Sequence, residues 1–173
     1  AEKINEDLLD ILPRLLVHAQ VIHQTGEKNF EWAKKRSGDL LETIPQKGRY
    51  HPFPFLESRQ LRLAAKVSTL VISRAGSSIF EIALWGKPSI IIPLPIAHDD
   101  HQRENAYSYA RTGAAMVIEE KNLKPELFLS VIHSILTDDV KQLTMVNGTK
   151  AFAKTDAADK IARVLLSIGS LHD

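Results

Sequence analysis

The sequence has 173 residues, of which 44% are apolar and 25% are charged, with a formal net charge of +1 at pH 7. This composition predicts one globular domain with a hydrophobic core and excludes a strongly basic surface that binds nucleic acid. Cysteine is absent, so disulfides and thiolate metal sites are excluded. No apolar run approaches the ~20 residues that a membrane-spanning helix needs.

Aliphatic residues recur at helical spacing over residues 1–16 and predict an amphipathic helix, in which Pro13 would introduce a kink or restart a turn. Residues 17–23 alternate in polarity and predict a strand, followed by a loop over residues 24–26. We interpret His23 as a packed histidine rather than a catalytic one, because the sequence offers it no evident acid or base partner.

Residues 27–37 predict a helix whose basic end suits a helix C-terminus, and residues 38–48 predict a loop or an irregular helix. Residues 50–55 are aromatic and contain prolines, which restrict them to a short or edge strand. The simplest interpretation of the phenylalanines in this strand is core packing. Residues 61–67 predict a short helix that leads into the central stretch.

The central stretch predicts a strand over residues 69–73, a tight turn over residues 74–78, a helix that Gly86 and Pro88 end, and a second strand over residues 89–93. Both strands are expected to be buried on both faces, because they are continuous apolar runs. A strand-helix-strand unit of this length implies a right-handed crossover in a parallel sheet. The expected apolar face of its helix comprises Ile79, Phe80, Ile82, Ala83 and Leu84.

The turn of this unit places backbone N–H groups at a helix N-terminus, beside the carboxyl end of a strand. Open α/β sheets bind ligands at this position, which favours phosphate. On the first helical turn, the Glu81 carboxylate can accept two hydrogen bonds from a ribose diol. The alternative is an ordinary helix start with Ser77 or Ser78 as the N-cap and Glu81 as the capping-box acid, and the residue types alone favour this alternative.

After the second strand, His98, Asp99, Asp100 and His101 invite a metal interpretation, which we reject because the four residues lie in one loop and cannot all converge. The next helix, residues 102–111, begins with Gln102 and Asn105 on one face. These amides either bind a ligand or cap the helix. The remaining chain predicts a strand over 113–119 and helices over 124–136, 138–152 and 155–168, the last capped by Thr155 or Asp156. The predicted fold is α/β, a Rossmann-like parallel sheet with helices on both faces, in a single domain over residues 1–173.

The segment SRAGSSIFEIALWGKPSIIIPLP, residues 73–95, resembles the nucleotide-sugar-binding signature of the C-terminal domain in MurG-type glycosyltransferases of family 28. In that family the segment has the pattern S-R-[SA]-G, then E-I-A, G-x-P and a strand that ends in Pro. The resemblance continues in order through HQTG, DDHQRENA, the Thr-Gly-Ala-Ala segment and the final Asp-Ala-Ala helix. In one departure, four residues separate Gly76 from Glu81, where many members have five.

The resemblance implies the donor-binding half of a GT-B glycosyltransferase. It implies that Glu81 binds the ribose, that Gln102 binds sugar hydroxyls, and that the loop over residues 55–57 contacts uracil through backbone groups with Phe55 or Leu56 against the ring. The substrate-binding residues that we expect are Leu56, Arg74, Gly76, Ser77, Ser78, Ile79, Phe80, Glu81, Gln102 and Asn105.

The family's reaction is inverting transfer of N-acetylglucosamine from UDP-GlcNAc to lipid I, undecaprenyl-pyrophosphoryl-MurNAc-pentapeptide, in peptidoglycan synthesis. The resemblance implies UDP-GlcNAc as the donor substrate, with no cofactor in the protein. The catalytic base and the lipid-acceptor site would lie in an N-terminal domain outside this chain, so we expect this chain alone to bind the donor with little or no transfer. The full-length protein would be cytoplasmic and peripheral on the cytoplasmic face of the cell membrane. Two alternatives stay open: a donor-binding subunit of a two-chain UDP-GlcNAc transferase, and a non-catalytic nucleotide-binding or assembly module.

In the resembled family, a strand and a glycine-rich turn, G-G-S-x-G-A, precede the first helix and help to cradle the diphosphate. We expect both to precede residue 1 in a longer protein. In a sheet of Rossmann order this strand is central, so it would separate the strands predicted over residues 17–23 and 69–73. Those two strands should then not pair with each other. In a molecule without this strand, a partner strand or self-association would have to fill the gap, or the two strands would have to slide together and close it.

Overall fold

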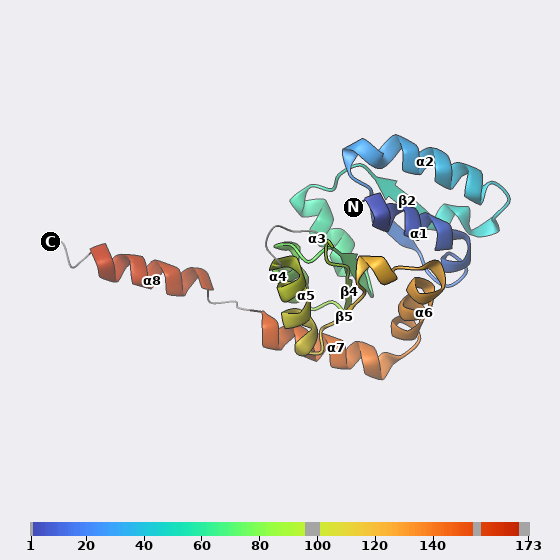
Figure 1. Cartoon of the computed structure of the whole chain (residues 1–173). Helices are drawn as coiled ribbons and strands as arrows, with labels where there is room; N and C mark the ends of the chain where they lie inside the picture. Colours follow the sequence, from blue (N-terminus) through green and yellow to red (C-terminus); the bar gives the residue numbers. More distant parts are fainter. Residues whose placement is uncertain (1, 96–100, 154–156, 170–173) are drawn as a thin grey trace.

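The computed structural model describes residues 2–95, 101–153 and 157–169 (Figure 1). Its helices α1 to α8 span Glu2–Leu15, Glu27–Leu41, Ser58–Val67, Ser78–Trp85, His101–Arg111, Pro125–Leu136, Asp139–Phe152 and Ala157–Gly169. Its strands β1 to β5 span Val21–Gln24, Tyr50–Phe53, Val71–Ser73, Ser89–Ile91 and Ala115–Val117. The 3₁₀ helices η1 and η2 span Pro45–Arg49 and Glu120–Asn122.

The strands form two parallel sheets, β1–β2 and β3–β4–β5. Strand, helix and strand alternate along the chain, which confirms the predicted α/β class. Within the described ranges, β1 and β3 are not hydrogen-bonded to each other. Val21 of β1 and Ile72 of β3 nevertheless border the same hydrophobic cluster, so the two sheets line one core.

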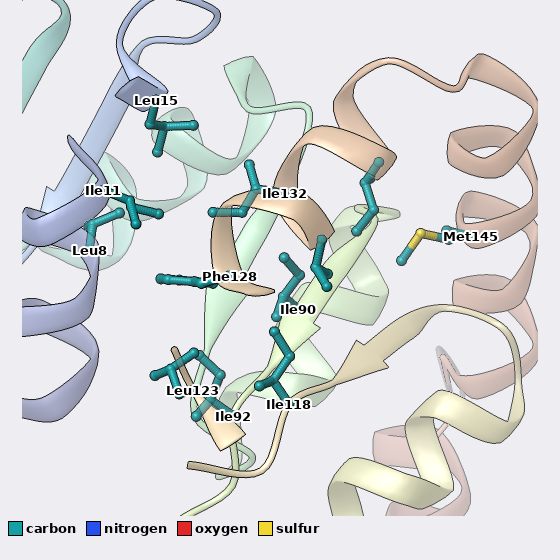
Figure 2. Close-up of a cluster of buried hydrophobic side chains, with 12 residues drawn as sticks. Leu8, Ile11, Leu15, Ile90, Ile92, Ile118, Leu123, Phe128, Ile132 and Met145 are labelled. Atoms are coloured by element: carbon teal, nitrogen blue, oxygen red, sulfur yellow. The ribbon is translucent and has the colours of Figure 1, made fainter. Parts of the chain in front are cut away.

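Strand β4 lies at the centre of the fold, and its side chains alternate between two hydrophobic clusters. Ile90, with Ile92 just beyond the strand, faces a cluster that contains side chains of α1 and α6, as Figure 2 shows. Ile91 faces the opposite cluster, which contains side chains of α4 and α5 such as Ile82 and Tyr109. Both faces of this sheet are therefore covered by helices, as predicted.

Helix α1 packs on two sides, which explains its dense aliphatic pattern. Its Leu8, Ile11 and Leu15 join the cluster with α6 (Figure 2). Leu9 and Leu12 of α1, with Leu16 just after the helix, pack against Ala33 and Leu41 of α2 and Tyr50 of β2. The helix continues through Pro13 to Leu15, so the expected restart at the proline is wrong.

Several element boundaries differ from the predictions. Helix α3 begins at Ser58 rather than residue 61, and the strands predicted over 69–73, 89–93 and 113–119 are shorter, at Val71–Ser73, Ser89–Ile91 and Ala115–Val117. The strand expected over residues 17–23 begins only at Val21, because the N–H groups of His18 and Ala19 donate to the Leu15 carbonyl and extend the helix end as a turn. Helix α2 runs on to Leu41, so the basic run lies inside the helix rather than at its end. There Arg36 forms an ion pair with Asp10 of α1, with 2.6 Å between Nη2 and Oδ1.

Several residues expected in the core are exposed. Phe53 and Phe55 are 38% and 59% exposed, and Phe80 and Leu84 lie on the solvent side of α4. Strand β3 is only half-buried rather than buried on both faces, because it forms the edge of its sheet. Apolar type alone thus misassigned these positions, since burial depends on what packs against each face.

The predicted end of α4 is confirmed. Gly86 adopts the left-handed conformation, with φ of 65°, and its N–H donates to the Ala83 carbonyl. The capping residues proposed for the last helix, Thr155 and Asp156, lie outside the described residues. No helix in the described part of the chain has the length and apolar character to cross a membrane.

Candidate functional site

The turn between β3 and α4 offers backbone donors at the carboxyl end of the sheet. The N–H groups of Gly76, Ser77 and Ser78 donate to no described residue, whereas those of Ile79 and Phe80 donate to the Gly76 and Ser77 carbonyls. The Ser78 hydroxyl lies 3.2 Å from the Ser73 hydroxyl and 3.3 Å from the Arg74 carbonyl, which holds the turn closed. Free N–H groups at a helix N-terminus are suited to a phosphate.

Glu81 is exposed on the first turn of α4, and its carboxylate has no hydrogen-bond or ion-pair partner among the described residues. Ser77 occupies the N-cap position without a side-chain capping bond, so the expected capping box is not formed. The ordinary helix start that the residue types favoured is therefore wrong in this respect. The Glu81 carboxylate remains available to a ligand.

Arg74 is already engaged by protein groups. It forms an ion pair with Glu120 of η2, and its Nη1 donates to the carbonyls of Ile92 and Pro93, at 3.2 and 3.3 Å. Its side chain is largely buried, and its Nε has no hydrogen-bond partner in the described part of the chain. Arg74 therefore joins the carboxyl ends of β3, β4 and β5 and directs its guanidinium into the protein.

Helix α5 brings the predicted amides to the same edge of the sheet. The Gln102 Oε1 accepts from the Leu94 N–H at 3.3 Å, and the Asn105 Nδ2 donates to the Ala75 carbonyl at 3.4 Å. Neither amide caps its own helix in these contacts. The structure thus brings Asn105 to the turn that contains Gly76 and lies just before Glu81, and it brings Gln102 to the segment just after β4.

The predicted uracil loop lies at the carboxyl end of the other sheet, after β2. Phe55 is exposed, whereas the Leu56 side chain is buried. The Leu56 N–H donates to the Gln24 side-chain oxygen at 2.9 Å, so this backbone group already has a protein partner. No hydrogen bond between described residues joins this loop to the turn after β3.

His23 is the packed residue that the sequence predicted. Its Nε2 lies 3.0 Å from the Asn5 Oδ1, and its Nδ1 lies 2.9 Å from the Tyr50 hydroxyl. The Asn5 amide nitrogen donates to the Thr25 carbonyl at 2.9 Å, so its oxygen accepts, and the neutral ring carries its proton on Nε2. Burial lowers the pKa of His23 to about 4 and raises the pKa of Tyr50 to about 12. A histidine held neutral in this way is structural.

A hollow of about 410 Å³ lies beside the candidate site, at the N-terminus of α1. It is lined by Glu2, Lys3, Glu6, Arg74, Leu94 and Glu120. A second hollow of about 350 Å³, between β5 and α7, contains none of the predicted residues. The described ranges contain no cluster of side chains that could hold a metal ion, and the His98 to Asp100 part of the rejected metal cluster lies outside them.

Sequence analysis missed Glu120 and Gln24, which contact the predicted residues Arg74 and Leu56. Their positions carried a usable signal, because each lies at or just after the carboxyl end of a strand, where sites form in parallel sheets. The pairing of Glu120 with Arg74 has no local sequence pattern, since the two residues are far apart in the sequence.

This arrangement, a parallel sheet with a donor-rich turn and an unpaired carboxylate at its carboxyl edge, is typical of nucleotide-binding α/β domains. The chain belongs to a family defined by one such domain: residues 1–161 match the glycosyltransferase family 28 C-terminal domain.

Relatives from different organisms carry the same enzyme name. The chain is 33% identical over 172 residues to the "UDP-N-acetylglucosamine--N-acetylmuramyl-(pentapeptide) pyrophosphoryl-undecaprenol N-acetylglucosamine transferase" of Syntrophotalea carbinolica, covering 97% of this chain and 46% of that protein. It is 35% identical to the enzyme of that name from Lawsonia intracellularis, over 98% of this chain and 45% of that protein. The chain thus spans about half the length of these relatives.

The fold is also similar to a solved structure. The crystal structure of Acinetobacter baumannii MurG matches with a TM-score of 0.80 and 28% sequence identity, over 96% of this chain and 46% of that one. The predicted resemblance to the donor-binding half of a GT-B enzyme is therefore confirmed at the level of family and fold.

Proposed function

We propose that this chain is the UDP-GlcNAc-binding domain of an N-acetylglucosaminyltransferase that acts on lipid I. Its relatives' names specify that reaction, and the family match covers most of the chain. The observation that carries the proposal is the exposed Glu81 carboxylate, which follows a run of backbone N–H groups by one helical turn; neither has a partner among the described residues. A carboxylate and amide donors at this spacing suit the ribose and the diphosphate of one nucleotide.

In this proposal, the N–H groups of Gly76, Ser77 and Ser78 donate to the diphosphate, and Glu81 accepts from the ribose hydroxyls. Gln102 and Asn105 replace their hydrogen bonds to Leu94 and Ala75 with hydrogen bonds to sugar hydroxyls. Little free energy is lost in this exchange, because both existing bonds are longer than 3.2 Å and therefore weak. The exposed Phe80 is a further proposed contact. Leu56 and Ile79 have buried side chains and N–H groups that donate to Gln24 and Gly76, so in this proposal they contact the donor only through their carbonyl oxygens.

In inverting transfer, the acceptor hydroxyl attacks the anomeric carbon while the bond from that carbon to the diphosphate breaks and UDP leaves. The negative charge that grows on the diphosphate is stabilised by the donors of the turn and the positive end of α4. We place the general base and the lipid I site in the part of the protein that the relatives have and this chain does not span. We further propose that the complete protein works at the cytoplasmic face of the membrane.

The test is a calorimetric titration of the chain with UDP-GlcNAc, UDP and ADP. We expect UDP-GlcNAc and UDP to bind. ADP should bind more weakly by roughly tenfold or more, because a site shaped for a pyrimidine leaves polar groups unpaired against a purine. Equal binding of UDP and ADP would reduce the proposal to a generic phosphate site, and no binding of either would overturn it.

A further inference from the structure

We propose that Glu119 and Glu120, consecutive carboxylates after β5, are positioning residues that anchor the two walls of the donor site. The inference rests on the proposed function, because it takes the turn after β3 and the start of α5 as those walls. Neither acid is expected to touch the donor. Each acts through the residue that it binds.

The backbone directs the two acids to different neighbours. The Ile118 N–H donates to the Ile91 carbonyl at 3.1 Å, so the chain is still fixed to the sheet one residue before Glu119. Glu119 is extended, with φ of −62° and ψ of 135°, and η2 begins at Glu120. This change of conformation lets adjacent side chains reach different elements from one rigid strand end.

Glu119 anchors α5. Its Oε1 accepts from the Arg103 Nε at 2.9 Å and from the Tyr107 hydroxyl at 2.8 Å. Arg103 and Tyr107 are four residues apart and therefore share a side of the helix. The Glu119 side chain is only 17% exposed, whereas Arg103 and Tyr107 are 50% and 39% exposed, so the carboxylate is shielded from solvent more than its two donors are.

Glu120 anchors the turn after β3. It forms the ion pair with Arg74, whose guanidinium also donates to the Ile92 and Pro93 carbonyls. Both carboxylate and guanidinium side chains are at least 80% buried, since they are 20% and 17% exposed. The Arg74 carbonyl in turn accepts from the Ser78 hydroxyl, so the anchor reaches the N-terminus of α4.

The bond lengths divide α5 into an anchored side and a side that can exchange partners. On the anchored side, the bonds to Glu119 are 2.8 and 2.9 Å long. On the side of the site, the Gln102 and Asn105 bonds are 3.3 and 3.4 Å long. A donor can therefore take over the two amides while Glu119 keeps the helix in place, which is how a site is pre-organised.

The test compares Glu119→Gln and Glu120→Gln with Glu126→Gln in the full chain. The control, Glu126→Gln, removes the charge of an ion pair that joins two other elements. In that pair, Arg14 of α1 is 56% exposed and Glu126 of α6 is 77% exposed. Each variant is titrated with UDP and with UDP-GlcNAc, and its amide hydrogen exchange is measured without ligand. Tyr107→Phe supplies a second, uncharged break in the Glu119 anchor.

We expect the affinity for UDP-GlcNAc to fall roughly tenfold in Glu119→Gln and threefold in Tyr107→Phe. The affinity for UDP should fall less in both variants, because α5 carries the sugar-binding amides. Glu120→Gln should lower the affinities for UDP and UDP-GlcNAc alike, because Arg74 supports the turn after β3 that is proposed to bind the diphosphate. Exchange should rise in residues 101–111 for the Glu119 variant and in residues 74–78 for the Glu120 variant. Glu126→Gln should change neither affinity nor exchange in these segments.

The readouts separate the inference from the proposed function. Wild-type affinities in Glu119→Gln and Glu120→Gln, or equal losses in all variants including the control, would overturn the positioning roles. Unchanged exchange in both segments would overturn the anchors whether or not ligand binds. If exchange rises as expected but wild-type chain binds no nucleotide, the anchors stand as structural links and both the proposed function and the positioning roles fail.

Discussion

The two sheets carry polar residues in opposite states at their carboxyl ends. Near the end of β1, the His23 side chain is buried and bound to the buried Asn5 of α1, and the Tyr50 hydroxyl of β2 completes the network. After β3, Glu81 is exposed, and neither its carboxylate nor the N–H groups of the turn have a partner among the described residues. Polar groups that are buried and paired stabilise the fold, whereas unpaired groups at a strand end are available for a ligand.

The largest effect is expected at the paired end. The pKa of His23 is lowered from 6.5 to about 4, so the unfolded state binds more protons than the folded state between these values. Stability is therefore fully present above pH 6.5 and falls as the pH drops towards 4, by about 3 kcal/mol in total.

Urea unfolding at pH 7 and pH 4.5 measures this loss. His23→Asn should lose about 2–3 kcal/mol less than wild type between the two pH values, since it has no imidazole to protonate. The exposed His18→Asn serves as the control and should behave as wild type. Identical pH dependence in His23→Asn and wild type would show that the histidine is not held neutral.

Next in size is a packing contrast between two glycines. A Cβ on Gly148 of α7 would lie 2.5 Å from the Thr112 carbonyl oxygen and 2.6 Å from the Ala114 nitrogen, both backbone atoms. Gly148→Ala should therefore lower the free energy of unfolding by roughly 1–3 kcal/mol. Gly38→Ala in α2 meets no atom within 4 Å and should raise it by up to about 1 kcal/mol. Denaturant titration of both variants gives the comparison, and equal stabilities would contradict it.

A smaller effect is expected at Glu81, after β3, where the substitution should change the free energy of ligand binding rather than that of unfolding. Glu81→Gln keeps the shape of the side chain and removes the charge that strengthens bonds to the ribose. UDP affinity should fall by about tenfold, with an unchanged melting temperature, because the carboxylate has no partner to lose among the residues that the structure describes. Unchanged affinity in a variant that melts normally would remove Glu81 from the site.

The smallest predicted effect concerns the exposed ion pair between Arg36 and Asp10, which are 43% and 41% exposed. Asp10→Asn should lower the free energy of unfolding by less than about 1 kcal/mol. This loss should be smaller at high salt, because salt screens the ion pair. A loss above that value would mean that the link between α1 and α2 contributes more than a surface pair. Chemical denaturation at low and high salt measures it.

The fold was predictable because its signals are local. The apolar run of β4, the glycine after α4 and the helical spacing of α1 each specify one element with its neighbours in sequence. The exposed Phe53 and Phe55 were not predictable, because an aromatic residue in a strand is buried only where another element covers its face.

The candidate site was predictable in position but not in its internal bonding. The turn and Glu81 follow from one continuous stretch of sequence, and their place at the sheet edge is a rule of parallel folds. That Arg74 turns inwards to Glu120, and that Gln24 occupies the Leu56 N–H, arise only when distant segments meet. Such pairings have no periodic trace in the sequence.

Amide hydrogen exchange with and without UDP-GlcNAc tests the central claim most directly. We expect added protection in residues 74–81 and at the start of α5. The second hollow, lined by residues such as Asp138 and Lys141, should be unchanged. The paired end around His23 should show no change either. Protection confined to the second hollow, or absent everywhere at saturating donor, would contradict a donor site at the carboxyl edge of β3 and β4.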